Sequence, residues 1–483
     1  MNLRVQALSG LRWTASVRLA SQIVTWAITL IVIRILSPAD YGLLAMATVF
    51  IAFLGMFSEL GLGAALVQGE NVDEPLLKRT FGVVLVIHLT LTGVLLIAAP
   101  FIASFYREPQ LTAVVQVLSL QFIIGGFAVV PGALLQRRME FRVRALLDLS
   151  GAIVASGVTL VMALSGAGVW ALVAGSIIGQ LVKTVGTNWY SPFLHAPDFS
   201  LKGMRNLLRF GGHFTSIQVI WMFLSQVDSL ICARLLGKDA LGFYSVGMHL
   251  ASLPSQKISG LVNQVAFPTF SRMQADIARV QANVLLGIRI LSFVAFPALW
   301  GISSIASEMV RLLLGEKWVA AVLPLQVLAL IIPIRMIGNF VGTATQGIGR
   351  TDILLRSVIV SLLILPLLLF IGAREWGMSG LLVAWLIASP LLFLQAMINT
   401  MPALNMKLRQ VGAAMFPAAL ASALMYGAVA LTRQALTSVH GDVIHLVVMV
   451  LAGATTYGTA SLLFNKKGAQ EFVALMRNIA TKK

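Results

Sequence analysis

The sequence predicts an all-α integral membrane protein of about 14 transmembrane helices, and three observations support this fold class. First, 58% of the 483 residues are hydrophobic and only 11% are charged, whereas soluble globular chains carry about 25% charged residues. Second, the apolar residues fall into fourteen stretches that are each long enough to span a bilayer. Third, the connections between these stretches have about 5 to 20 residues, which is too short for a soluble catalytic domain.

The expected spans follow one another along the whole chain and are bounded by charges, prolines or glycine clusters. The first span runs from about Thr14 to Leu36, behind Arg4 and Arg12. It lacks the small-residue cleavage pattern of a signal peptide, so we expect it to be retained as a membrane helix. The later spans are expected to begin near Gly42, Phe81, Thr112, Leu149, Val169, Phe210, Phe243, Val284, Val322, Ile353, Gly380, Val411 and Val443.

Basic residues are distributed unequally between the two sides of the predicted membrane. The chain has 35 Lys and Arg against 18 Asp and Glu, a net charge of +17. With connections assigned to alternate sides, 25 of the basic residues fall on the side of the N-terminus, eight fall on the other side, and Lys257 and Arg335 lie at depth. The positive-inside rule then places both termini in the cytoplasm, which requires an even number of spans. The basic excess sets this topology, so no basic domain is expected to bind nucleic acid.

The chain also repeats itself. At an offset of 200, five identities fall in the thirteen positions from 30 to 42, pairing Leu30, Ile31, Arg34, Leu36 and Gly42 with Leu230, Ile231, Arg234, Leu236 and Gly242. At an offset of 210, further identities keep the same order, pairing Gln116, Val117, Leu118, Leu120, Gly132 and Gln136 with Gln326, Val327, Leu328, Leu330, Gly342 and Gln346.

Six spans separate the two copies, so both copies keep the same orientation in the membrane. We therefore expect two pseudo-symmetric six-helix lobes, an N-terminal lobe at residues 1–200 and a C-terminal lobe at residues 201–405. Helices 13 and 14 and a cytoplasmic tail follow at residues 406–483. Two parallel lobes of this kind are typical of alternating-access transporters.

Ionisable side chains at membrane depth are costly and are therefore candidates for function. Lys257 lies too far from either end of its span to reach the surface easily, and we expect it to point into a water-filled cavity. A structural ion pair with Asp228 is the alternative. Arg335 follows Pro333, which we expect to break the helix and to free carbonyl groups. A guanidinium suits bidentate phosphate binding, and an interhelical structural contact is the alternative for Arg335.

Three further charged residues are candidates with two interpretations each. Arg18 is either a ligand for the substrate or a side chain that reaches the cytoplasmic surface. Asp228 is expected either to pair structurally or to exchange H⁺ or bind Na⁺. Glu59, close to Gly61 and Gly63, either pairs locally or takes part in ion coupling.

Other chemistry is not indicated by the sequence. It contains no nucleophile–base constellation, P-loop, dinucleotide fingerprint or metal motif, so we expect neither an enzyme nor a bound cofactor. The single cysteine, Cys232, lies inside an apolar run, and we expect it to serve as a small core residue.

Three segments resemble polysaccharide flippases of the multidrug/oligosaccharidyl-lipid/polysaccharide exporter superfamily, and most closely the colanic-acid-exporter branch of the Wzx-type flippases. These segments are IRILSPADYGLLAMATVFIAFLGMFSELGLGAALVQ at 33–68, QVDSLICARLLGKDALGFYSVG at 226–247 and AFPTFSRMQ at 266–274. The resemblance extends over nearly the whole chain. It implies a V-shaped fold of two six-helix lobes plus helices 13 and 14.

The resemblance also implies a function in the inner membrane. Such proteins move undecaprenyl-diphosphate-linked oligosaccharide repeat units to the periplasmic leaflet, in a pathway with glycosyltransferases and a polysaccharide polymerase. Related flippases have a cationic central cavity, for which the candidates here are Arg18, Lys257 and Arg335.

The first functional hypothesis is therefore a flippase for exopolysaccharide or O-antigen assembly, coupled to H⁺ or Na⁺ through Asp228 or Glu59. The second is a cation-coupled multidrug exporter of the same superfamily, which the deep basic residues disfavour because cationic drugs suit acidic cavities. The third is a membrane polymerase or glycosyltransferase, which the short loops disfavour.

Overall fold

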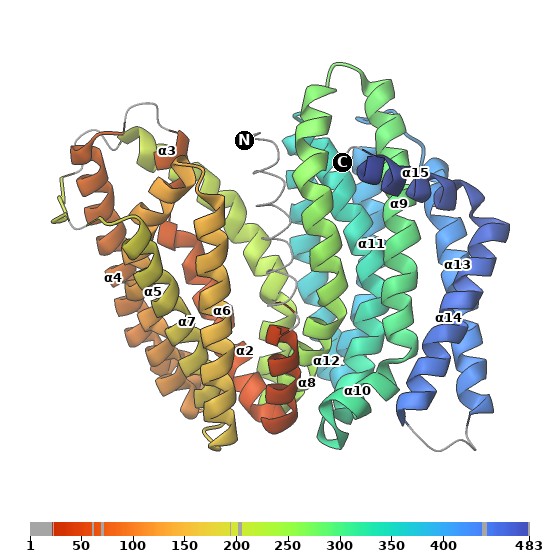
Figure 1. Ribbon diagram of the computed structural model, residues 1–483, viewed down its shortest axis with the longest axis horizontal. Coiled ribbons are helices and arrows are strands. Elements are labelled where there is room, and N and C mark those ends of the chain that lie inside the picture. The colour runs from red at the N-terminus through yellow and green to blue at the C-terminus, as the bar shows by residue number, and fades with distance from the viewer. Residues whose placement is uncertain are drawn as a thin grey trace. The chain divides into compact units, whose positions relative to one another are not determined.

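The structure is a computed structural model that describes residues 22, 24–59, 62–68, 72–193, 195–200, 205–436 and 442–481 (Figure 1). Within these ranges every regular element is a helix. The chain divides into two compact units, which we call unit 1 (Met1–Gly242) and unit 2 (Phe243–Lys483). The lobe boundaries expected at residues 200 and 405 stay a prediction.

Unit 1 contains long apolar helices that lie side by side (Figure 1). The apolar helix Val24–Ile35 comes first. It is followed by α2 (Pro38–Glu59), α3 (Leu62–Gln68), α4 (Glu74–Tyr106), α5 (Gln110–Arg137), α6 (Phe141–Leu164), α7 (Val169–Tyr190) and the first part of α8 (Arg205–Arg272). The start of α4 shows why these residues begin a helix, because the Asp73 side chain accepts a hydrogen bond from the backbone N–H of Leu76 (3.0 Å).

Unit 2 begins inside α8 and contains a second group of long helices. They are α9 (Ile277–Ser304), α10 (Ala306–Leu314), the short 3₁₀ helix η1 (Glu316–Ala321), α11 (Val322–Gly347), α12 (Thr351–Thr400), α13 (Leu408–Ala435), α14 (Asp442–Phe464) and α15 (Lys466–Thr481). In Figure 1, α9, α11, α13 and α14 run side by side, whereas α15 lies across their ends.

Two of the helices are broken by a glycine in the left-handed region. Gly237 (φ 85°) divides α8, and Gly377 (φ 62°) divides α12. Among the described residues, ten helices are long and apolar enough to cross a membrane. Together with the second segment of α12, the two segments of α8 and the helix Val24–Ile35, they account for the fourteen expected segments. The structure confirms the predicted fold class, and the chain is a multi-pass membrane protein.

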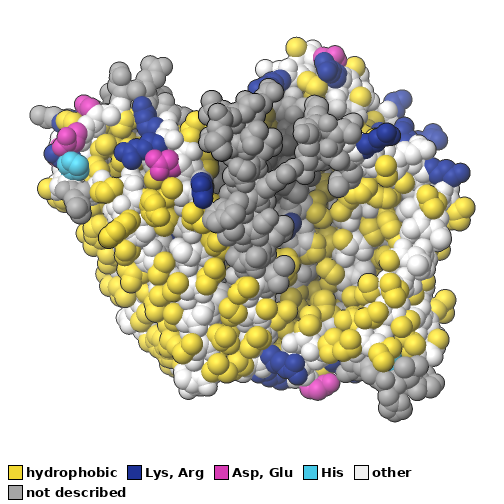
Figure 2. All heavy atoms as spheres, in the orientation of Figure 1, with side chains coloured by type: hydrophobic (Ala, Val, Ile, Leu, Met, Phe, Trp, Pro, Cys, Tyr) yellow, Lys and Arg dark blue, Asp and Glu magenta, His cyan; other side chains and the backbone are white. Residues whose placement is uncertain are grey.

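The surface of each unit is that of a membrane protein. Figure 2 shows hydrophobic side chains over the sides of both units, with charged side chains gathered towards the ends. Large apolar side chains such as those of Phe101 and Leu363 are about 70% exposed, which fits contact with lipid. The interior is also apolar, and Cys232 is completely buried, as expected of a small core residue.

The internal repeat is visible in the backbone. The N–H of Glu140 donates to the carbonyl of Leu135 (3.0 Å), and 210 residues later the N–H of Arg350 donates to the carbonyl of Thr345 (3.1 Å). The residues before them, Met139 (φ 57°) and Gly349 (φ 79°), both adopt the left-handed conformation. The turns α5–α6 and α11–α12 thus have the same backbone geometry, at positions related by the offset of 210.

The segment 195–200, which follows α7, is fixed on α4 within unit 1. The backbone N–H of Asp198 donates to the carbonyl of Lys78 (3.1 Å), and the Nε of Arg79 donates to the Asp198 carboxylate (3.1 Å). The N–H of Ser200 donates to the same carboxylate (2.9 Å). These bonds hold the pKa of Asp198 below its usual range, mainly because the Ser200 N–H and then Arg79 stabilise the charged form.

Candidate functional site

Neither the part of α8 from Phe243 to Arg272 nor α11 carries an acidic residue, and the same is true of α9 and α13 in unit 2. The His, Lys and Arg side chains of this part of α8 and of α11 are those of His249, Lys257, Arg272 and Arg335. An anion near these helices therefore meets no carboxylate from either of them.

A polar stripe runs along one face of α11. Arg335, Asn339, Thr343 and Gln346 follow one another at spacings of four, four and three residues, which places them on one side of the helix. Each is exposed or half-buried, whereas most of the other α11 residues are buried. Because polar groups are costly against lipid, we infer that this stripe faces water or a polar solute.

The deepest residue of the stripe, Arg335, lies on an aromatic ring. Its guanidinium carbon is 4.7 Å from the ring centroid of Trp385 on α12. The Trp385 indole N–H donates to the hydroxyl of Tyr244 on α8 (3.0 Å). Trp385 and Tyr244 are only 4% and 1% exposed, whereas Arg335 is half-buried. Stacking of this kind contributes about 0.5 to 2 kcal/mol.

Within the described part of the chain, the Arg335 guanidinium donates no hydrogen bond and forms no ion pair, and its recorded contact is the one with the Trp385 ring. Its five N–H groups project from the edge of the plane, and the stacked ring occupies one face. A phosphate oxygen pair is the geometric complement of such an edge.

A second polar stripe lies on α8 in the same unit. His249, Gln256 and Lys257 are exposed, and Ser252 between them is half-buried. The Ser252 hydroxyl donates to the carbonyl of His249 (3.0 Å), and the Gln256 amide donates to that hydroxyl (3.2 Å). The structure thus places the two predicted basic ligands, Lys257 and Arg335, in one unit and outside its buried core.

The predicted coupling residues have a different setting. Asp228 lies on the first part of α8, in unit 1, and is 4% exposed. Its carboxylate accepts a hydrogen bond from the N–H of Ser229 (2.7 Å). Glu59 is the last residue of α2, and its side chain lies outside the described set. Arg18 lies outside the described residues. The roles of these residues, and an ion pair of Asp228 with Lys257, stay predictions.

One sequence-based expectation is wrong. Pro333 does not break α11, which runs without interruption from Val322 to Gly347. A proline lacks an N–H and removes one hydrogen bond of the helix, but neighbouring helices support α11 on several sides. The buried residues Ile332, Met336 and Ile337 around the proline show this support.

Sequence reasoning missed Trp385, Tyr244 and Asn339. The polar spacing from Arg335 to Gln346 is a signal in the sequence that identifies Asn339. No sequence signal identifies Trp385 and Tyr244, because they lie 141 residues apart in the chain. Among the described residues, no group of three or more His, Cys, Asp or Glu side chains is arranged to hold a metal ion.

Comparison with known proteins gives a family match over residues 31–323, to a family described as "Polysaccharide biosynthesis protein". An "Uncharacterized membrane protein in cps region" of Klebsiella pneumoniae is 26% identical over 80% of both chains. The "Lipopolysaccharide biosynthesis protein WzxC" of Escherichia coli K12 is 25% identical over 80% of this chain and 79% of that protein. The "Succinoglycan biosynthesis transport protein ExoT" of Rhizobium meliloti is 28% identical over 62% of this chain and 61% of that protein.

Solved structures share the fold. The "Lipid II flippase MurJ, inward closed conformation" has a TM-score of 0.77 at 15% identity and covers 94% of this chain and 99% of its own. An inward-facing multidrug resistance MATE family transporter of the MOP superfamily has a TM-score of 0.60 at 15% identity, covering 80% of this chain and 98% of its own. At this identity the likeness describes the architecture alone.

Proposed function

Since this chain belongs to the polysaccharide biosynthesis protein family, we propose that it is an alternating-access flippase for undecaprenyl-diphosphate-linked oligosaccharide repeat units. It carries them across the inner membrane for exopolysaccharide or O-antigen biosynthesis, with both of its termini in the cytoplasm. The family match, the relatives named for polysaccharide biosynthesis and transport, and the transporter fold support this proposal. Glycosyltransferases build the substrate and a polymerase consumes it in such a pathway.

The proposal rests on the surroundings of Arg335. Its guanidinium stacks on the Trp385 ring, and its N–H groups donate no hydrogen bond to any described residue. The helix that carries it, α11, contains no acidic residue. A diphosphate supplies the paired oxygens that a guanidinium edge binds. Lys257 adds a second positive charge from α8, and the amide and hydroxyl groups of the two stripes suit the hydroxyls of sugars.

The remaining predicted residues complete the proposal. Arg18 is assigned to the diphosphate together with Lys257 and Arg335. Asp228 and Glu59 are assigned to coupling with H⁺ or Na⁺. A buried carboxylate such as that of Asp228 can bind a cation only if that cation reaches it, so coupling through this residue requires the surrounding helices to open.

The experiment measures polymer export in a deletion strain that carries Arg335→Ala or Lys257→Ala. We expect export to fall about tenfold or more at unchanged protein level, because a charged hydrogen bond contributes about 1.5 to 3 kcal/mol. Lipid-linked repeat units should accumulate on the cytoplasmic side. Arg374→Ala is the matched control, because Arg374 is an exposed arginine of unit 2 that pairs with its neighbour Glu375 (3.9 Å). Full export by both variants would contradict the proposal.

A multidrug exporter is the competing function. The acid-free stretches of α8 and α11 are a poor surface for cationic drugs, which require carboxylates or exposed aromatic rings. Drug susceptibility of the deletion strain distinguishes the two, because a flippase deletion leaves it unchanged.

A further inference from the structure

Tyr244, Trp385 and Arg335 form a connected chain of side chains from three helices of unit 2. The Tyr244 hydroxyl accepts from the Trp385 indole (3.0 Å), and the Arg335 guanidinium lies on the face of that indole (4.7 Å). The aromatic residues are buried, and only the arginine reaches the polar stripe of α11. The two aromatic residues therefore cannot offer a surface to a solute, but they do determine where the guanidinium lies.

A free arginine side chain samples many rotamers, and the conformational entropy that it loses on binding weakens the affinity for the ligand. An indole ring that is itself fixed by a hydrogen bond limits the guanidinium to one plane. Its donor edge is then oriented before the ligand arrives. We propose that Trp385 and Tyr244 are positioning residues that orient Arg335 for a diphosphate group. This inference rests on the proposed function, because it takes Arg335 as a diphosphate ligand.

The test measures the affinity of the purified full chain, in lipid nanodiscs, for farnesyl diphosphate. We expect Arg335→Ala to weaken binding about tenfold or more and Trp385→Leu to weaken it about fivefold. The double variant should bind no more weakly than Arg335→Ala, because the ring acts through the arginine. None of these variants should change the residual binding of farnesol, which has no phosphate.

Two further variants separate positioning from general stability. Trp385→Phe keeps an aromatic ring but loses the N–H, so we expect a loss of affinity between those of wild type and Trp385→Leu. Trp300→Leu is the matched control, because the Trp300 indole also donates to an oxygen, the carbonyl of Leu330 (3.0 Å), in the same unit. It should leave the affinity for the diphosphate unchanged. Thermal unfolding of each variant shows whether the fold is retained.

The outcomes distinguish the two proposals. If Arg335→Ala leaves the affinity unchanged, the assignment of Arg335 in the proposed function fails. If Arg335→Ala weakens binding but Trp385→Leu and Trp385→Phe do not, the positioning role fails while the proposed function stands. Fully additive losses in the double variant would also overturn positioning. If Trp385→Leu does not fold, the Trp385→Phe and Tyr244→Phe variants decide, and normal affinity in both contradicts the role.

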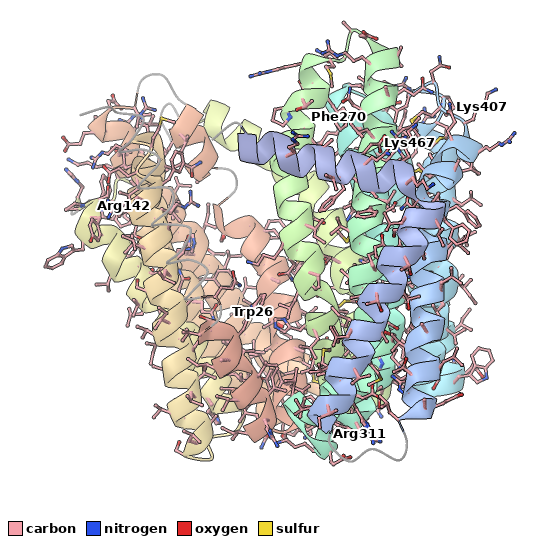
Figure 3. All side chains as sticks on the ribbon, turned by 45° about the vertical axis from the view of Figure 1, so that its right-hand side comes forward. Trp26, Arg142, Phe270, Arg311, Lys407 and Lys467 are labelled. Atoms are coloured by element: carbon pink, nitrogen blue, oxygen red, sulfur yellow. The ribbon has the colours of Figure 1, made fainter. Side chains whose placement is uncertain are left out.

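A separate observation concerns α15, which lies across the end of unit 2 (Figures 1 and 3). Its inner side is fixed to α9 by two hydrogen bonds between Arg289 and the Glu471 carboxylate (both 2.7 Å). The Phe472 ring packs on Phe293 with centroids 5.3 Å apart. Glu471 is the one acidic residue in the sequence of α15, and its charge is paired with Arg289 on the inner side of the helix.

The outer side of α15 is basic. Among the described side chains of α15, the exposed ones recur at helical spacing and are those of Lys466, Lys467, Gln470, Val473, Ala474 and Arg477. Lys407, at the start of α13, lies at the same end of unit 2 as Lys467, whereas Arg311 lies at the opposite end (Figure 3). A helix that lies across the span ends and presents lysines around an exposed valine has the character of an interfacial helix. We infer that this face binds the headgroups of anionic phospholipids.

The test titrates the purified full chain with phosphatidylglycerol or phosphatidylcholine and counts bound lipids by native mass spectrometry. Each basic residue near a membrane surface contributes about 1 kcal/mol, so Lys466→Gln/Lys467→Gln should weaken phosphatidylglycerol binding about thirtyfold. Phosphatidylcholine binding should not change. The control Arg311→Gln/Arg374→Gln removes two exposed charges of unit 2 that belong to α10 and α12, and it should have no effect. Equal losses in both double variants, or no loss in the first, would overturn the inference.

Discussion

Gly42 on α2 lies against the backbone of Lys238 on α8, and Gly242 on α8 lies in the same way against the backbone of Pro38 on α2. A β-carbon on Gly42 would overlap the carbonyl of Lys238, and a β-carbon on Gly242 would overlap the carbonyl of Pro38. These four positions are related by the offset of 200 that the sequence repeat shows. Within unit 1, the start of α2 and the α8 residues just after Gly237 therefore lie backbone against backbone, beside the ion pair of Lys238 with Glu108 (2.9 Å).

Alanine at either glycine should disrupt this contact. The added β-carbon meets backbone atoms, which cannot move without shifting a helix, so we expect Gly42→Ala and Gly242→Ala each to lower the free energy of unfolding by about 2 kcal/mol or more. Thermal unfolding in detergent measures the effect. Gly93→Ala is the control, because no atom outside its own helix lies within 4 Å of a β-carbon there. A Gly42→Ala protein as stable as the control would contradict the tight contact.

The carboxylate of Asp198 should make the attachment of segment 195–200 dependent on pH. Its pKa is lowered from the ordinary value of 3.8 in the folded chain. A lowered pKa stabilises the fold fully above pH 3.8, and this contribution is lost as the pH falls through the folded value. Asp198→Asn should therefore unfold at a lower temperature than wild type at pH 7, and the difference should vanish at a pH well below 3.8.

Glu316→Gln is the control for this experiment, because the Glu316 side chain is 80% exposed and lies 4.0 Å from Arg311. It should match wild type at every pH. A difference between Asp198→Asn and wild type that persists unchanged in acid would show that the carboxylate charge is not what fixes the segment.

Introducing a glycine in the α5–α6 turn and removing one from the α11–α12 turn should change the free energy of unfolding in opposite directions. Met139 holds a left-handed conformation that costs a side-chain-bearing residue about 1 kcal/mol, and Gly349 holds the same conformation without that cost. Met139→Gly should raise the free energy of unfolding by up to about 1 kcal/mol, and Gly349→Ala should lower it by about 1 kcal/mol. Chemical denaturation of the two variants checks the signs. Changes of the same sign in both would mean that the two turns are not equivalent.

Much of the architecture could be predicted from the sequence, because membrane spans depend on composition over about 20 residues. The helices α7 and α11 begin at Val169 and Val322, as expected. The repeat could also be predicted, since identities at fixed offsets need no knowledge of packing. The break expected at Pro333 is absent because a proline breaks a helix only where surrounding groups do not support it.

The candidate site could be predicted only in part. Arg335 and Lys257 are identifiable because a charge inside an apolar stretch is visible in one line of sequence. Trp385 and Tyr244 are not identifiable, because their role depends on contacts among α8, α11 and α12 that exist only in the folded chain. A buried tryptophan in an apolar span is indistinguishable in sequence from any other core residue.

The burial of Cys232 makes the natural chain suitable for site-specific labelling. It is the single cysteine of the sequence and has no accessible surface, so a maleimide reagent has no exposed thiol to attack in the folded protein. Cysteines added in pairs, one in each unit, can carry spin or fluorescent labels without first replacing the native residue. Distances between such labels, recorded with and without a polyprenyl diphosphate, would follow the transport cycle in the otherwise unaltered protein.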